Sequence, residues 1–153
     1  MVMDYLGHDV SQCKQANDRF ERTDCPCSQC DSTTPATPAC VRTGWPDFER
    51  YGFDFRRTHD EALEWDEVKS ELSKEKDCRR TPFVFTWHLE VGGGHMMVAT
   101  GYRTEEGVNK IDILNPSLPC GGDDDEIPYE EYVGRPGDHW HWDDFYAIEY
   151  TGT

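Results

Sequence analysis

The chain has 153 residues, enough for one domain with a hydrophobic core, and its formal net charge is −16, from 31 acidic and 15 basic residues. This charge repels nucleic acid and anionic membranes, so we exclude both as partners, and it favours solubility. No apolar run approaches the roughly 20 residues that span a bilayer, and the opening residues lack the basic and apolar stretches of a secretion signal.

The opening segment, MVMDYLG, predicts the last turns of a buried helix that ends at Gly7 in the C′ position. No Ser, Thr, Asp or Asn precedes it as an N-cap, and so few residues do not nucleate a helix alone. The segment either packs on the rest of the fold or is the tail of a longer helix. An exposed apolar face on residues 1–6 would support self-association.

The next segment predicts a short helix and then an irregular arm. Residues 9–20 suit a helix with Asp9 or Ser11 as its N-cap. Residues 21–58 are rich in Pro, Gly, Ser, Thr and Asp, which is turn chemistry. A disordered linker would not carry the aromatic residues of this arm, so we expect an ordered arm over the core. The aromatic residues are Trp45, Phe48, Tyr51, Phe53 and Phe55.

Cysteine is abundant, and its count of seven is odd, so at least one thiol is left over or pairs outside the chain. Cys25, Cys27 and Cys30 form a C-x-C-x-x-C pattern that would need a fourth ligand to hold zinc. The candidates for that ligand are Cys13, Cys40 and His59. Without a second C-x-x-C, disulfides or free thiols are favoured, and disulfides indicate a secreted or extracytoplasmic location. We expect no cofactor.

Residues 60–76 predict the clearest helix, because Leu63, Trp65, Val68 and Leu72 fall near one face. The hydrophobic period then changes to two, which predicts strands over 81–91, 94–103, 107–116, 126–134 and 142–152. The acidic run at 123–126 is interpreted as a solvated loop. These elements predict a single α+β domain over 1–153, with a helical half and irregular arm at 1–80 and an antiparallel sheet at 81–153.

A histidine and an asparagine are predicted to meet on two of these strands. His95 stands at the mouth of one strand, behind Gly93 and Gly94, which let a substrate or another backbone come close. Asn115 ends the next strand, so a tight turn near residues 105–107 makes the two neighbours. An amide oxygen beside an imidazole fixes its tautomer and orients it as a general base for a thiol. We assign Gly93, Gly94 and Trp87 to the substrate cleft.

The stretch HWHWDD contains a pair of alternating histidines. His139 and His141 alternate, so they share a face with Asp143, which makes a metal site conceivable. An aromatic surface or rim is the preferred interpretation.

The stretch GGGHMMVATGY followed by VNKIDILNP resembles the His and Asn segments of papain-like cysteine peptidases. It is most similar to the compact bacterial branch with staphopain-like and bacteriocin-processing enzymes. The resemblance implies a helical half before an antiparallel sheet, and hydrolysis of a peptide or protein substrate. It also implies His95 as general base and Asn115 as the residue that orients it.

The family's nucleophilic cysteine opens the central helix, usually as Cys-Trp-Ala-Ala, after an oxyanion Gln. MVMDYLG looks like the rear half of that helix, so the nucleophile is expected about two to three turns before Met1 and the chain alone is expected to be inactive. Cys13, which follows Gln12, is the substitute within the chain. The alternatives are a non-catalytic peptide- or protein-binding module of the same fold, with the aromatic arm at its cleft, and a cysteine-rich zinc or disulfide structural domain.

Overall fold

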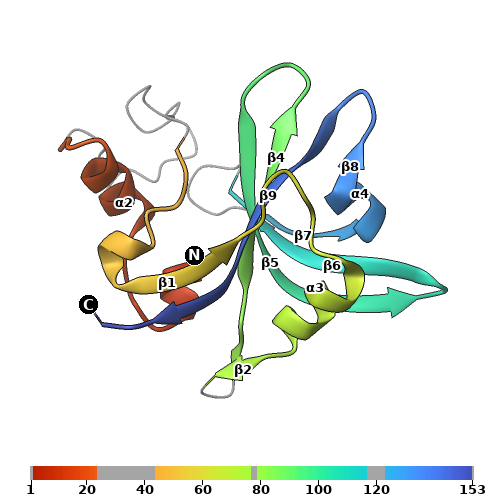
Figure 1. The fold of residues 1–153 in the computed structure, drawn as a ribbon, viewed down its shortest axis with the longest axis horizontal. Coiled ribbons are helices and arrows are strands. Elements are labelled where there is room, and N and C mark those ends of the chain that lie inside the picture. Colours follow the sequence, from red (N-terminus) through yellow and green to blue (C-terminus); the bar gives the residue numbers. More distant parts are fainter. Residues whose placement is uncertain (1, 24–43, 77–78, 117–122, 153) are drawn as a thin grey trace.

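An antiparallel sheet forms the centre of the molecule (Figure 1). The computed structural model describes residues 2–23, 44–76, 79–116 and 123–152. Within them, a seven-stranded sheet has the order β1-β9-β4-β5-β6-β7, with β8 paired to β9. In chain order the elements are α1 (Val2–Tyr5), α2 (Gln12–Arg19), η1 (Glu49–Tyr51), β1 (Phe53–Arg57), α3 (Trp65–Leu72), β2 (Glu75–Lys76), β3 (Arg79–Arg80), β4 (Phe83–Leu89), β5 (Gly94–Glu105), β6 (Val108–Asn115), β7 (Asp123–Pro128), α4 (Tyr129–Val133), β8 (Gly134–Arg135) and β9 (His139–Tyr150). This arrangement is an α+β fold, as predicted.

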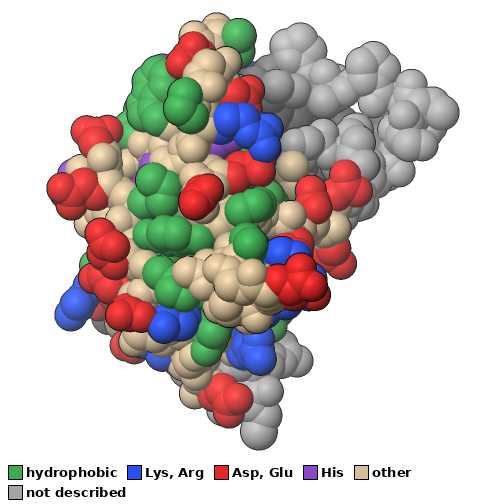
Figure 2. Space-filling view, turned by 90° about the vertical axis from the view of Figure 1, so that its right-hand side faces the viewer, with side chains coloured by type: hydrophobic (Ala, Val, Ile, Leu, Met, Phe, Trp, Pro, Cys, Tyr) green, Lys and Arg blue, Asp and Glu red, His purple; other side chains and the backbone are tan. Residues whose placement is uncertain are grey.

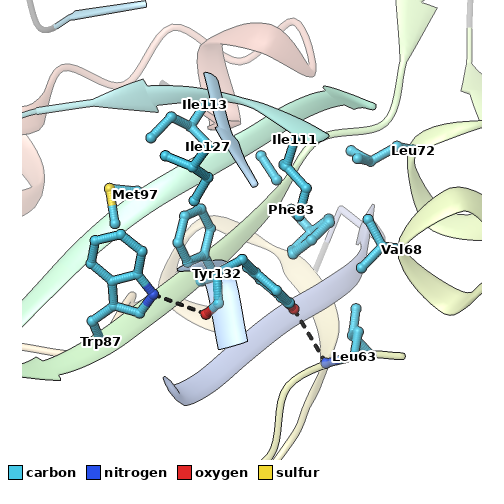
Figure 3. Close-up of a cluster of buried hydrophobic side chains, with 12 residues drawn as sticks. Leu63, Val68, Leu72, Phe83, Trp87, Met97, Ile111, Ile113, Ile127 and Tyr132 are labelled. Carbon is cyan, nitrogen blue, oxygen red and sulfur yellow. Dashed lines mark hydrogen bonds between the residues drawn. The ribbon is translucent and has the colours of Figure 1, made fainter. Parts of the chain in front are cut away.

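The sheet separates two hydrophobic clusters, because alternate side chains of each strand point to opposite faces. The first cluster lies against α3 and α4 and includes Phe83 and Phe85 of β4 (Figure 3). The second lies against α1 and the arm and includes Val84 of β4, between those two phenylalanines. The two sides of the sheet are therefore distinct environments, and each site residue belongs to one of them.

The predicted end of the first helix is confirmed. Gly7 has φ of 87°, a left-handed conformation that glycine adopts without steric cost. The N–H of Gly7 donates to the Asp4 carbonyl at 2.9 Å, and that of His8 to the Met3 carbonyl at 2.8 Å. This pair of bonds is a Schellman motif, which satisfies carbonyls at the helix end.

The opening residues do not present the apolar face that was predicted as a route to self-association. Val2 and Met3 are 5% and 2% exposed and belong to the second cluster. They pack on Val84 and Val98 of the sheet, so their hydrophobic surface is covered within one chain. None of the helices in the described ranges is long and apolar enough to cross a membrane.

The helix predicted over 60–76 is shorter, because tertiary hydrogen bonds hold its first residues in a loop. The Leu63 N–H donates to Asp144 at 2.9 Å, and its carbonyl accepts from the Tyr129 hydroxyl at 2.8 Å. These bonds are made to distant strands and helices rather than along the chain. Helix α3 then begins at Trp65, where the Glu67 carboxylate accepts from the Glu64 N–H at 2.9 Å.

Several strands were missed, among them β1 and the start of β7, and part of one predicted strand is a helix. β1 lies in the segment interpreted as an irregular arm, and it pairs with β9 at one edge of the sheet. The acidic run at 123–126 is not a loop but belongs to β7, the other edge, where exposed aspartates face water. Residues 126–134, predicted as a strand, form the end of β7 and then α4, because the chain turns into a helix after Pro128.

Candidate functional site

His95 and Asn115 are neighbours, as the sequence predicted. His95 is the second residue of β5, and Asn115 is the last residue of β6. The strands are joined by Glu106 and Gly107, with φ of 51° and 82°, which is the positive-φ pair of a type I′ hairpin turn. The resulting register places Val98 opposite Leu114, and the His95 Nε2 lies 2.9 Å from the Asn115 Oδ1.

This contact decides which ring nitrogen carries the proton. An amide oxygen only accepts hydrogen bonds, so Nε2 of His95 is the donor in the contact with Asn115. In the neutral imidazole the lone pair is then on Nδ1, which is the atom that takes up a proton. Both side chains are half-buried at the rim of the sheet, where β5 begins and β6 ends.

The residues assigned to the substrate cleft lie in different settings. Gly93 and Gly94 are exposed, and Gly93 has φ of 89°, which favours glycine in the turn before β5. Trp87 is the cross-strand partner of His95, but it is 8% exposed and belongs to the first cluster. Its indole N–H donates to the Tyr132 carbonyl at 3.0 Å (Figure 3). Trp87 therefore forms packed support beside His95.

A cleft of about 300 Å³ lies on the opposite side of the sheet from His95 and Asn115. By strand alternation His95 shares its side of β5 with Met97, whereas Met96 and Val98 point to the other side. The cleft is lined mainly by α1, α2, the arm and β5, and the lining includes Val2, Phe20, Trp45, Met96, Val98 and Pro116. Helix α1 therefore lies on the opposite side of the sheet from the His95 side chain.

The aromatic arm is used mainly for packing. Phe48 and Phe53 are 3% and 1% exposed and belong to the second cluster. Tyr51 donates its hydroxyl to Asp18 of α2 at 2.7 Å, and burial is the largest of the effects that raise the pKa of this phenol. Of the arm's rings, Trp45 and Phe48 line the cleft, and the Trp45 ring meets Trp142 edge-on at 4.7 Å.

His139, His141 and Asp143 do not converge as the alternating pattern predicted. β9 has a bulge against β4, so that Phe85 lies opposite Asp144 but Trp87 opposite His141. His141 contacts Asp144 instead of Asp143, at 3.0 Å, and Asp143 binds Arg57. The two histidines are buried rather than forming an aromatic rim. Within the described ranges, no group of three His, Cys, Asp or Glu side chains is arranged to hold a metal ion.

A buried polar network that the sequence analysis missed surrounds Asp144, which is fully buried. The Tyr132 hydroxyl donates to the Asp144 carboxylate at 2.8 Å, and the Leu63 N–H donates to it at 2.9 Å. Burial, together with the charge of Asp144, raises the pKa of the Tyr132 phenol well above its usual value of 10.0. Tyr132 and Asp144 belong to two different predicted strands, 126–134 and 142–152. The only sequence signal for their contact was a Tyr and an Asp within predicted strands.

The cysteines lie outside the part of the chain that the structure describes. This concerns the side chain of Cys13, the nucleophile candidate, and residues Cys25, Cys27, Cys30, Cys40, Cys78 and Cys120. The zinc and disulfide interpretations therefore stay predictions. No protein-family model matches the sequence, and neither a curated protein nor a solved structure matches it.

Proposed function

We propose that this chain carries the general base and the orienting amide of a papain-like cysteine peptidase, His95 and Asn115. The supporting observation is the hydrogen bond of 2.9 Å between His95 Nε2 and Asn115 Oδ1. It holds the ring with Nδ1 as the proton acceptor, which is the state that a thiol needs in a general base. The resemblance of the two surrounding strand sequences to papain-like peptidases supplies the reaction class.

In the proposed reaction a cysteine thiol gives its proton to Nδ1 of His95, and the thiolate attacks the carbonyl carbon of a peptide. The tetrahedral intermediate collapses as the His95 imidazolium protonates the departing amine, which leaves a thioester. Water, deprotonated by His95, then attacks the thioester and releases the carboxylate and the thiol. Throughout, Asn115 keeps the ring in position by accepting from Nε2.

We propose, as the resemblance implies, that the nucleophile belongs to a helix that continues α1 towards the N-terminus. We therefore expect the 153-residue chain alone to be inactive. Because α1 packs on the second cluster, such a thiol would have to approach His95 from the opposite side of the sheet. Cys13 is the alternative within the chain, at the second position of α2.

Covalent labelling separates these two assignments. The chain is treated with a peptide-like electrophile that traps thiolates, and the adduct is located by peptide mapping, in the native sequence and in His95→Ala. We expect no cysteine whose labelling rate depends on His95. Rapid labelling of one cysteine that falls about 100-fold or more in His95→Ala, the scale of general-base catalysis, would place the nucleophile within the chain.

The role of the pair itself is tested by ¹⁵N NMR of the histidine rings. We expect the proton of neutral His95 on Nε2, and a shift of this tautomer balance in Asn115→Ala. Asn109→Ala is the matched control, because Asn109 lies on the same strand and its side chain contacts Thr104 instead. A proton on Nδ1 in the native chain, or no response to Asn115→Ala, would remove the basis of the proposal.

A peptide-binding module of the same fold is the second candidate, and the apolar cleft of about 300 Å³ favours it. Such a module would bind peptides with an affinity that does not change in His95→Ala. The two candidates are compared in a chain that includes the nucleophilic cysteine. Peptide hydrolysis by this chain that is lost in His95→Ala supports the peptidase. Binding without hydrolysis supports the module.

A further inference from the structure

The cleft of about 300 Å³ between α2, the arm and β5 has an apolar floor and two charged residues in its lining. The floor side chains are 6% exposed or less, and they include Met3, Phe48 and Val98. The charged side chains, Arg19 and Asp47, are 43% and 25% exposed, so they lie nearer the mouth. Small-molecule sites in proteins have this build, a concave apolar surface with a few polar groups, and the volume of the cleft is at the small end of their range.

The two charged side chains leave polar atoms open to a ligand. Nη1 of Arg19 lies 3.8 Å from Oδ2 of Asp47, which is beyond hydrogen-bond distance. Within the residues that the structure describes, this is the only polar contact of the Arg19 guanidinium. The same Oδ2 accepts from Arg50 Nε at 2.8 Å, and Oδ1 accepts no hydrogen bond from the described residues. Gln15, an uncharged polar residue of the lining, already donates to the Val10 carbonyl at 2.9 Å.

The charge of the molecule argues against a ligand of a single sign. The net charge of the whole chain is −16, and Figure 2 shows acidic side chains spread over the face that it draws, so a free anion is repelled. A cation is attracted by the chain as a whole, but it meets Arg19 in the lining and Arg50 on Asp47. A ligand with one charge of each sign and no net charge complements the pair of Arg19 and Asp47, and the rest of the molecule does not repel it.

An α-amino acid has this charge pattern on the required scale. Its ammonium and its carboxylate are attached to one carbon, so the nitrogen and the oxygens lie roughly 3 to 3.5 Å apart. This separation is similar to the 3.8 Å between Arg19 Nη1 and Asp47 Oδ2. A guanidinium is a planar fork of donors that fits a carboxylate, and a carboxylate oxygen accepts from an ammonium. The side chain of the same ligand leaves from that carbon, so it can enter the apolar floor of the cleft.

We propose that this cleft binds a free α-amino acid with a large apolar side chain, with leucine as the reference ligand. The Arg19 guanidinium donates to the carboxylate of the ligand, and Asp47 Oδ1 accepts from its ammonium. The ligand side chain packs on Met96 and Val98 in the lining. The site is independent of the proposed peptidase reaction, because the His95 side chain lies on the other side of the sheet. His95→Ala should therefore leave this binding unchanged.

The test is an NMR titration of the 153-residue chain, labelled with ¹³C in its methionine methyl groups, with L-leucine up to about 10 mM. Met96 lines the cleft, whereas Met97 points to the other side of β5 and is 1% exposed. We expect a saturable shift of the Met96 methyl resonance and little change at Met97. Binding should be about 10-fold weaker or more for N-acetyl-leucine, which lacks the ammonium, and for leucinamide, which lacks the carboxylate. Alanine keeps both charges but loses three buried carbons, so it should bind about 50-fold more weakly.

Substitutions test the two charged contacts separately. Arg19→Leu and Asp47→Asn should each weaken leucine binding about 10-fold, the scale of a hydrogen bond to a charged group. Asp66 and Lys69 form an exposed ion pair at 2.6 Å on α3, which packs on the other side of the sheet. Asp66→Asn and Lys69→Leu are therefore the matched controls, and both should bind leucine normally.

Any of four results would overturn the proposal. One is the absence of a Met96 shift at about 10 mM leucine. Another is binding of N-acetyl-leucine and leucinamide as tight as that of leucine, which would mean that the charged pair takes no part. A third is unchanged binding in Arg19→Leu while circular dichroism shows the variant folded. A fourth is equal binding of the acetylated and amidated peptide Gly-Leu-Gly, which would assign the cleft to the peptide-binding module. The two leucine derivatives keep the test valid if a variant is unfolded.

Discussion

Several buried hydrogen bonds converge on Asp144. Its carboxylate accepts from the Tyr132 hydroxyl and from the Leu63 N–H, and it lies 3.0 Å from His141 Nε2. Its backbone N–H donates to the Thr58 hydroxyl at 2.7 Å. The network thereby connects β9 with α4 and with the loop that precedes α3. A buried carboxylate without these partners would be strongly destabilising, so the segments depend on one another.

We predict that Tyr132→Phe lowers the free energy of unfolding by about 1–3 kcal/mol at neutral pH, because it leaves the Leu63 N–H and Asp144 each without one partner. The deficit should shrink above pH 10. The pKa of the Tyr132 phenol is raised in the folded state, whereas in the unfolded chain the phenol ionises near the usual pKa of 10.0. Ionisation therefore stabilises the unfolded state of the native sequence as pH rises above 10, and the native protein loses stability that Tyr132→Phe does not lose.

Urea unfolding of both proteins between neutral pH and pH 11 or so measures this difference. Other tyrosines with raised pKa values, such as Tyr51, titrate in both proteins and cancel in the comparison. A deficit that stays constant across this range would show that the Tyr132 phenol does not resist ionisation in the folded chain.

At the scale of elements, the two short N-terminal helices depend on their ends and on the sheet. Helix α1 is only four residues long and is closed by Gly7 in its left-handed conformation. Helix α2 begins after Ser11, whose hydroxyl accepts from the Lys14 N–H at 3.2 Å. Isolated helices of this length are not stable in water, so capping and docking must both contribute. Gln15 and Asp18 dock α2, through bonds to the Val10 carbonyl and the Tyr51 hydroxyl.

We predict that Ser11→Ala lowers the free energy of unfolding by about 0.5–2 kcal/mol, because the Lys14 N–H in the first turn of α2 loses its acceptor. Ser11→Asp is the matched control, since a carboxylate also accepts at an N-cap and suits the helix dipole. Urea unfolding of the three proteins compares them. An unchanged free energy in Ser11→Ala would mean that α2 separates from the rest of the fold before global unfolding.

At the scale of the whole molecule, one sheet serves both hydrophobic clusters. β4 contributes Phe83 and Phe85 to one cluster and Val84 to the other, and β9 lies between β1 and β4. We therefore expect the N-terminal segment and the strands after residue 81 to fold as one unit. Loss of packing on either side removes support from the same strands, so the two clusters should unfold together.

We predict that Leu72→Ala in the first cluster and Ile148→Ala in the second each lower the free energy of unfolding by about 2–5 kcal/mol. Each variant should keep a single transition, with the same midpoint by far-ultraviolet circular dichroism and by tryptophan fluorescence. The exposed substitution Val133→Ala is the control and should change little. Two separate transitions in either variant would show that the clusters unfold independently.

The strands around the candidate site were predictable because their signals are local. Alternating apolar residues from 83 to 115 define β4, β5 and β6, and the Glu106–Gly107 turn sets the register of β5 and β6. Once that register is given, the contact between His95 and Asn115 follows from the antiparallel pairing alone.

The sequence by itself thus determined the elements whose hydrogen bonds and turns are made between residues near in the chain, together with the cap at Gly7. The tertiary structure decided the elements whose partners are distant. Phe53 to Arg57 form a strand because they pair with β9. Residues 60–64 are not helical because Asp144 and Tyr129 form hydrogen bonds with the Leu63 backbone. The bulge in β9 turned Asp144, and not Asp143, towards His141. Hydrogen bonds across such separations depend on the assembled sheet, and no local pattern encodes them.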